Sequence, residues 1–221
     1  MGLFSLLILT GCNAKQSTPS SSLPSQDSQE NSSTIIEEST TTPSVEHPVV
    51  EEQPEQEMIL FSKEYKIYIN PSVQFTNQYV DKIHNEGQVM NEIAVLLVNR
   101  LKSETNLSVK ANLDGLSLSA IHSNGGGGTG SEVWVSKKNY TFGKIMLDEF
   151  NQIHNFRNRG VKYGDGTDAS LYEIRNVLAP SALIEILFHD EWTQANFILN
   201  NKQEIADSFF KGIVSYFQQV D

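Results

Sequence analysis

The sequence predicts an α/β fold, in which a mostly parallel twisted sheet is covered by helices on both faces. Short alternating or apolar segments typical of strands recur along residues 58–221, and segments with apolar residues at helical spacing lie between them. Strands that alternate with helices favour a parallel sheet, because parallel neighbours must be joined by a crossover. The segment also has an ordinary size for one domain with one core.

Four segments are predicted as strands. Residues 65–69 alternate and end at Asn70-Pro71, which indicates a strand followed by a turn. Residues 116–121 alternate in the same way, and residues 132–135 are rich in β-branched and aromatic side chains. Residues 183–188 are apolar except for one carboxylate, as in a strand that is buried on both faces.

Three segments are predicted as helices, at residues 87–102, 143–156 and 202–218. Each places apolar side chains on one face at a spacing of three and four residues. The predicted core positions are Met90, Ile93, Ala94, Leu97, Val98 and Leu101, then Ile145, Phe150 and Ile153, and last Ile205, Phe209, Gly212, Ile213, Tyr216 and Phe217.

The first residues indicate the compartment. Residues 3–9 are an apolar run that is too short to span a bilayer, and it ends in Leu9-Thr10-Gly11-Cys12. This ending resembles the bacterial lipobox, in which the cysteine is lipidated and becomes the new N-terminus. Residues 1–12 are therefore predicted as a lipoprotein signal peptide with its lipobox, and the protein as lipid-anchored outside the bacterial cell membrane. The alternatives for Cys12 are a buried thiol or an incidental cysteine near a cleaved signal.

Residues 13–57 form a segment of different composition. They contain no Phe, Trp or Tyr, and they carry nine acids against one base, Lys15. Such a segment cannot bury enough apolar surface to offset its chain entropy, so it is predicted to be a disordered tether. It accounts for −8 of the net charge of −11, which leaves the domain at 58–221 near neutral. The lack of a basic surface argues against nucleic acid as a partner.

Three polar residues stand at positions where chemistry is expected. Glu185 lies in an apolar strand, where a carboxylate needs a cation, a metal or a donor. His122 follows a predicted strand, and Glu86 precedes the first predicted helix. Taken singly, each has an ordinary alternative: a structural ion pair for Glu185, a hydrogen-bonded loop histidine for His122, and a favourable acid near a helix N-terminus for Glu86.

Together, six short blocks in the same order resemble the zinc-dependent N-acetylmuramoyl-L-alanine amidases of the amidase-3 type. The blocks are Ile67-Tyr68-Ile69-Asn70-Pro71-Ser72, Glu86 before Ile93-Ala94, Ser119-Ala120-Ile121-His122-Ser123-Asn124, Gly130-Ser131-Glu132-Val133-Trp134, Arg159-Gly160-Val161-Lys162 and Ala179-Pro180-Ser181-Ala182-Leu183-Ile184-Glu185. The resemblance implies that Glu86 and His122 bind zinc and that Glu185 is catalytic.

The chain departs from this family at the turn after the first strand. The family has a zinc-binding histidine there, in Asp-Pro-Gly-His, whereas this turn reads Asn-Pro-Ser and then Val73. A catalytic zinc site has three protein ligands and an open position. His189, which follows the strand of Glu185, is the favoured replacement, with His84 as the second choice and a surface loop histidine as the alternative for His189.

A second departure is a shortening. The family normally places a helical crossover between its second strand and the strand that carries the histidine, but only about five residues separate 107–110 from Leu116. A parallel crossover needs a dozen or more residues. Either the strand at 107–110 or the crossover is therefore predicted to be lost.

The reaction implied by the resemblance is hydrolysis of the peptidoglycan amide between N-acetylmuramic acid and L-alanine by zinc-activated water, with Glu185 as the base. Arg175 and Asn176 are candidate substrate contacts, and the glycines at 125–128 are interpreted as a flexible hairpin link. The rival interpretation is a degraded amidase fold that binds cell wall without cleaving it. The domain is short for a two-lobed solute-binding lipoprotein.

Overall fold

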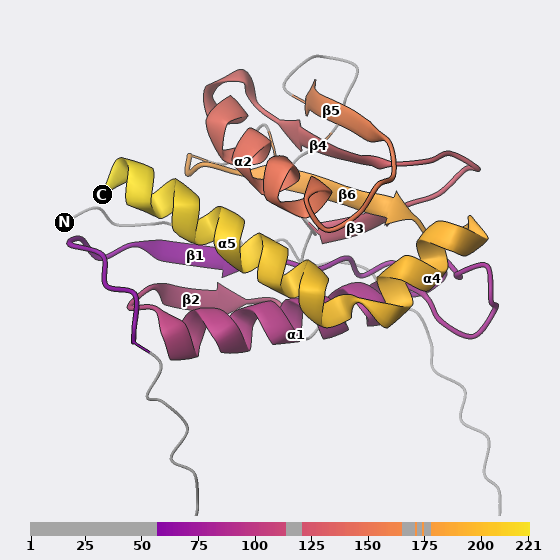
Figure 1. Cartoon of the computed structure of the whole chain (residues 1–221), viewed down its shortest axis with the longest axis horizontal. Coiled ribbons are helices and arrows are strands. Elements are labelled where there is room, and N and C mark those ends of the chain that lie inside the picture. The colour runs from indigo at the N-terminus through magenta and orange to yellow at the C-terminus, as the bar shows by residue number, and fades with distance from the viewer. Residues whose placement is uncertain (1–56, 114–120, 165–170, 172–173, 175–177) are drawn as a thin grey trace, which may run out of the picture. The chain divides into compact units, whose positions relative to one another are not determined.

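We describe the fold from a computed structural model (Figure 1). All of the described helices and strands lie in one compact unit, Glu52–Asp221. The described residues are 57–113, 121–164, 171, 174 and 178–221. The predicted lipidation site Cys12, the tether, Arg175, Asn176 and all but the last residue of the predicted strand at 116–121 lie outside them.

The strands form two sheets. β1 (Lys66–Ile69) and β2 (Ser108–Ala111) make a parallel pair. The second sheet has the order β3-β6-β4-β5, with β3 (Ile121–Asn124), β6 (Ala182–Phe188), β4 (Ser131–Val135) and β5 (Asn158–Tyr163). β3 is parallel to β6 and β5 to β4, while β4 and β6 are antiparallel. Three of the four strand pairs are parallel, as predicted.

The helices flank these sheets. They are α1 (Glu86–Glu104), α2 (Tyr140–Asn151), α4 (Trp192–Asn200) and α5 (Lys202–Val220), with a 3₁₀ turn at Lys137–Asn139. α5 packs against both α1 and α2 (Figure 1). The mixed α/β class predicted from the sequence is confirmed. In the described part of the chain, no helix is long and apolar enough to cross a membrane.

α4 was not predicted from the sequence. Its cap is Glu191, whose carboxylate accepts the backbone N–H groups of Thr193 and Gln194. Helix caps are more often Ser, Thr, Asp or Asn, so this start signal was not recognised. Only Gln194, Ala195 and Ile198 are buried in α4, which explains why its apolar pattern is weak.

The sequence predicted that either the strand at 107–110 or the crossover after it is lost. The strand is retained, as β2. β2 is joined to its parallel neighbour β1 by α1, and Ala111 lies level with Ile69. Ile121 at the start of β3 bridges Pro71, only two residues beyond the end of β1. β3 therefore begins where β1 and β2 end. A parallel strand beside β2 would require the chain to run back along the length of the sheet. Because β3 starts level with the end of β2, this return is not needed and a short connection is enough.

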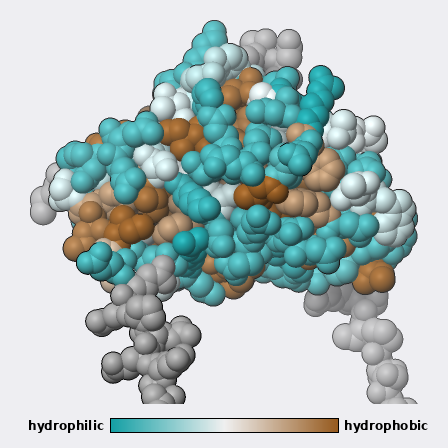
Figure 2. Space-filling view, in the orientation of Figure 1, coloured by the Kyte–Doolittle hydropathy of each residue, from teal (hydrophilic) through white to brown (hydrophobic). Residues whose placement is uncertain are grey.

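Alternation along β6 separates a core face from a polar face. Ile184 and Ile186 are buried in the apolar core, so Glu185 between them points to the other side. On the core side, Ile184 lines an apolar cavity of about 690 Å³ together with Phe209 and Ile213 of α5. Figure 2 shows that hydrophilic residues cover much of the visible surface and that apolar residues gather near β1.

The glycine run after β3 is not the flexible hairpin link that was predicted. It joins β3 to β4 past the end of β6, which lies between them. The Asp190 carboxylate accepts the N–H groups of Gly126 and Gly127 at 2.7 and 2.9 Å, and Gln194 Oε1 accepts the N–H of Gly130 at 2.8 Å. The loop is thus fixed to the segment that follows β6.

Gly130 is expected to be essential for stability, whereas Gly127 is not. Both have a positive φ, which costs a residue with a side chain roughly 1–2 kcal/mol. A Cβ at Gly130 would lie 1.9 Å from the Arg157 carbonyl oxygen, but a Cβ at Gly127 would meet nothing within 4 Å. In urea unfolding, Gly130→Ala should lose several times more free energy of unfolding than the matched control Gly127→Ala. Equal losses would contradict this close approach.

Candidate active site

A row of polar side chains crosses the polar face of the four-stranded sheet. His122 of β3 is paired with Glu185 of β6, Glu185 with Glu132 of β4, and Glu132 with Gly160 of β5. Residues paired directly across neighbouring strands point to the same face. The sheet therefore aligns one histidine and two carboxylates, drawn from three segments that are distant in sequence.

The N-terminus of α1 delivers a third carboxylate to this row. The helix starts at Glu86, and the Asn85 side chain caps it by accepting the N–H of Gln88 at 2.9 Å. Glu86 is 1 % exposed, and its Oε1 lies 2.9 Å from His122 Nδ1. Burial alone would raise the pKa of Glu86, but hydrogen bonds from His122, Asn77 and Ser72 outweigh it and lower the pKa below its usual value.

Gln74, which was not singled out in the sequence, completes this cluster. Its Nε2 lies 3.0 Å from His122 Nδ1 and 3.4 Å from Glu86 Oε1. Asn77 Nδ2 donates both to Gln74 Oε1 at 2.7 Å and to Glu86 Oε2 at 2.9 Å. Gln74 directly follows Val73, so the turn that lacks the family's histidine places an amide beside the two predicted ligands. Nothing in the sequence alone indicated this contact.

Glu185 is the least satisfied acid of the row. Its Oε2 is buried and has no hydrogen-bond partner among the residues described. Burial raises the pKa of Glu185 to about 7; the charges of Glu86 and Glu132 add to the increase, while that of His122 opposes it. A carboxyl group with this pKa can accept a proton from water near neutral pH and give it up again.

Glu132 is a further buried acid, 4 % exposed, that sequence analysis placed only in a strand. Trp134 Nε1 donates to its Oε1 at 3.1 Å, and Arg159 Nε forms an ion pair with its Oε2 at 3.0 Å. The argument used for Glu185, a carboxylate in an apolar run, applies equally to Glu132 and could have identified it.

A bulge in β5 brings Arg159 to this carboxylate. Ser131 pairs with Asn158 and Glu132 with Gly160, so Arg159 is an extra residue without a partner in the ladder. Gly160 has a φ of 83°, which a side chain would disfavour, and its N–H donates to Asn158 Oδ1 at 2.8 Å. Bulges re-aim side chains in this way.

The structure does not bring His189 or His84 to the cluster. His189 Nδ1 lies 3.0 Å from Ser123 Oγ and 3.1 Å from the Ser123 carbonyl oxygen, and its ring stacks on Tyr79. His84 Nδ1 lies 2.6 Å from Asp81 Oδ2. Both candidate replacements for the missing turn histidine are thus held by other partners.

The donor chemistry of the site meets the requirements of zinc only in part. Glu86 and His122 supply a carboxylate oxygen and an imidazole nitrogen, both ordinary zinc ligands. Within the described ranges, however, no three His, Cys, Asp or Glu side chains come together as a metal site. A catalytic zinc centre uses three protein ligands, so these residues form two thirds of one and do not complete it.

Comparison with known proteins identifies the family. The model of the N-acetylmuramoyl-L-alanine amidase family matches residues 74–215. This is well over half of the chain. The protein belongs to the N-acetylmuramoyl-L-alanine amidase family. The match begins at Gln74, directly after the position at which Val73 replaces the family's histidine. No curated protein matches the chain.

Solved amidase structures share the fold. The CwlV catalytic domain from Bacillus (Paenibacillus) polymyxa var. colistinus has a TM-score of 0.61 at 16 % identity, over 71 % of this chain and 99 % of that one. An amidase from Clostridium difficile 630 has 0.61 at 18 %, over 72 % and 100 %. AmiC2 of Nostoc punctiforme has 0.60 at 16 %, over 72 % and 99 %. The amidase-3-like fold predicted from the sequence is therefore confirmed.

Proposed function

We propose that this protein hydrolyses the peptidoglycan amide between N-acetylmuramic acid and L-alanine. Membership of the amidase family supports this reaction. The observation that carries it is Glu185, whose burial raises its pKa to about 7 and whose Oε2 has no hydrogen-bond partner in the described part of the chain. A group that is costly to bury and left unpaired is typical of a catalytic carboxylate.

Glu185 acts first as a base and then as an acid in this proposal. It takes a proton from a water molecule as the water oxygen attacks the carbonyl carbon of the lactyl group. It then gives that proton to the nitrogen of L-alanine as the C–N bond breaks, so the products are a free lactyl carboxyl group and a free amine. Glu132, which forms an ion pair with Arg159, lies beside Glu185 and contributes to the raised pKa of Glu185.

Zinc is a separate part of the proposal. Glu86 and His122 would hold the ion, which when bound polarises an amide carbonyl and lowers the pKa of its water. The proton transfers assigned to Glu185 are derived without it. The support is the pair's 2.9 Å approach on the same side of the sheet as Glu185, together with the family match.

Two observations favour the rival function, in which the domain binds cell wall without cleaving it. The described residues supply two metal ligands instead of three, and the Gln74 amide contacts both of them. The deciding experiment is digestion of purified peptidoglycan by the wild-type protein, with labelling of newly exposed amino termini. Release of L-alanine amino termini supports the amidase. Co-sedimentation with peptidoglycan without such release supports the binding module.

We also propose that the protein acts outside the cell membrane, anchored by a lipid on Cys12 and tethered by residues 13–57. The support is the lipobox-like Leu9-Thr10-Gly11-Cys12 and the composition of the segment after it. A flexible chain of this length spans roughly 35–40 Å, enough to hold the domain away from the bilayer. Cys12→Ser should abolish incorporation of labelled fatty acid and release the protein from membranes. Unlabelled wild-type protein would refute the anchor.

A further inference from the structure

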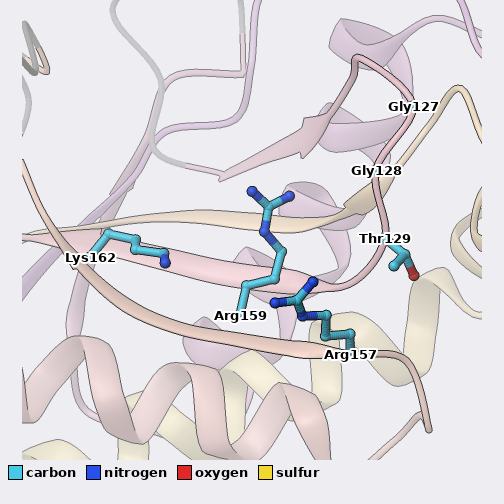
Figure 3. A pocket seen from close by; sticks show the side chains of 6 residues that line it. All are labelled: Gly127, Gly128, Thr129, Arg157, Arg159 and Lys162. Atoms are coloured by element: carbon cyan, nitrogen blue, oxygen red, sulfur yellow. The ribbon is translucent and has the colours of Figure 1, made fainter.

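A basic pocket lies beside the polar row, at the outer edge of the four-stranded sheet. It has a volume of about 480 Å³. One wall is the loop Gly127, Gly128 and Thr129, and the other is Arg157, Arg159 and Lys162, from β5 and the residue before it. Figure 3 shows the ends of Arg157 and Lys162 directed toward the middle of the strand, where Arg159 lies. Every charged side chain that lines this pocket is a cation.

Two of these cations have no partner among the residues that the structure describes. Arg159 is paired with Glu132 and lies over the Phe188 ring. The side chains of Arg157 and Lys162 form neither an ion pair nor a hydrogen bond with any described residue. The nearby Asp190 carboxylate is already engaged by the loop N–H groups of Gly126 and Gly127. Within the described part of the chain, the positive charge of Arg157 and Lys162 is therefore uncompensated.

The wall opposite the cations is fixed rather than mobile. Besides the two N–H groups held by Asp190, Gln194 Nε2 donates to the Gly128 carbonyl oxygen at 3.3 Å. A Cβ at Gly128 would lie 2.3 Å from the Phe188 ring, so the loop backbone approaches this ring closely. A Cβ at Gly127 would meet only open space. The pocket is thus a preformed hollow that needs no rearrangement to admit a small group.

The pocket is aligned with Glu185. Glu185, Glu132 and Gly160 are direct partners across β6, β4 and β5, and Arg159 is the bulged residue before Gly160. Neighbouring strands are about 4.8 Å apart, so β5 lies roughly 10 Å from β6. Consecutive Cα atoms of a peptide are about 3.8 Å apart, so a substrate peptide that runs across the sheet covers this distance in two to three residues.

We propose that this pocket binds a free carboxylate of the peptidoglycan stem peptide, that of the second stem residue, and so selects acidic stems. In a stem whose second residue is a glutamate linked through its side chain, the α-carboxyl group of that residue is either free or amidated. A guanidinium binds a carboxylate through two parallel N–H···O bonds, and an ammonium adds a point charge. The inference rests on the proposed function, because it assumes that the scissile amide lies at Glu185.

Binding of two matched muropeptides tests the inference. One carries a free α-carboxylate at the second stem residue and the other a carboxamide, and titration with full-length Glu185→Gln protein avoids turnover. The carboxylate form should bind about tenfold more tightly, in keeping with hydrogen bonds to a charged group. Adding Arg157→Ala and Lys162→Ala should abolish this preference. Lys211→Ala, which removes an exposed lysine of α5 outside the pocket, should preserve it.

Three results would overturn the assignment. The first is equal binding of both muropeptides, and the second is a preference for the acidic form that survives in the Arg157→Ala/Lys162→Ala protein. The third is inorganic phosphate that binds as tightly as the acidic muropeptide, because the pocket would then be a general anion site. Circular dichroism of the double variant checks that it folds, and single variants replace it if it does not. Failure of the proposed function is a different result: the wild-type protein would release no L-alanine amino termini from peptidoglycan.

Discussion

Glu185→Gln is expected to lower the rate of peptidoglycan cleavage by roughly 10²–10⁴-fold, the range typical of a lost general base. Glutamine keeps the size of the side chain but accepts no proton. The rate of amino-terminus release by purified protein measures the effect. Glu204→Gln, which neutralises an exposed carboxylate of α5, should cleave at the wild-type rate. A Glu185→Gln protein as fast as the Glu204→Gln control would remove Glu185 from the mechanism.

The same substitution should stabilise the fold at neutral pH. The pKa of Glu185 is about 7 in the folded protein, whereas the ordinary value for the unfolded chain is 4.5. Between these two pH values the side chain is therefore ionised in the unfolded state but still protonated in the folded state. Stability from this group is therefore complete below pH 4.5 and is lost as the pH rises to about 7. The loss is on the order of 3 kcal/mol. Melting at pH 7 should thus occur at a higher temperature in Glu185→Gln, and the wild-type cleavage rate should rise with pH through about 7.

Val73→His is expected to give the largest change in zinc affinity. It restores a histidine at the turn beside Gln74, whose amide already reaches both Glu86 and His122. A third protein ligand completes the set that a catalytic zinc requires. The gain in zinc affinity should exceed roughly 10–100-fold, which is the loss of metal affinity expected when a residue that hydrogen-bonds to a metal ligand is removed. Competition with a chromophoric chelator measures the affinity, and Leu60→His, which adds a histidine at an exposed position, is the control.

His122→Ala tests the other ligands in the same assay. The wild-type protein should retain about one zinc per chain, and His122→Ala should lose it. His84→Ala should not lose zinc, because His84 is held by Asp81. Equal zinc contents in the wild-type and His122→Ala proteins would refute the assignment of Glu86 and His122. An unchanged affinity in Val73→His would show that the turn does not face the metal.

Hydrophobic periodicity predicted the helices and strands whose pattern of burial is the same from one end to the other. α1 and α5 each bury one continuous stripe, and β6 is buried as its apolar run required. β5 was not predicted, because its residues are half-buried or exposed throughout and show no alternation. β3 begins where β1 and β2 end, and this offset makes a long crossover unnecessary. The offset depends on the bridge between Pro71 and Ile121, a pairing that local sequence does not encode.

Of the candidate site residues, Glu185 was singled out because it breaks an apolar pattern, and Glu86 and His122 because of their positions beside predicted elements and the family resemblance. The structure places Glu86 in contact with His122 and pairs His122 with Glu185 across β3 and β6. His189 was chosen for its proximity to Glu185 in sequence, but β6 ends at Phe188 and the next residue turns to Ser123 and Tyr79. Gln74 and Arg159 depend on a turn and a bulge, whose side-chain directions follow from backbone geometry and not from composition.

The strand order imposes an order of assembly. β6 is the last strand in sequence, yet it lies between β3 and β4 and is hydrogen-bonded to both. Neither ladder can form before residues 182–188 are available, so a chain that is synthesised or exported from its N-terminus carries β3 and β4 with their inner edges unpaired. The proposed base arrives on the same strand that closes the sheet. The proposed hydrolytic centre therefore cannot form in a partly emerged chain, and a truncation before Ala182 should leave a protein with neither a central sheet nor the proposed activity.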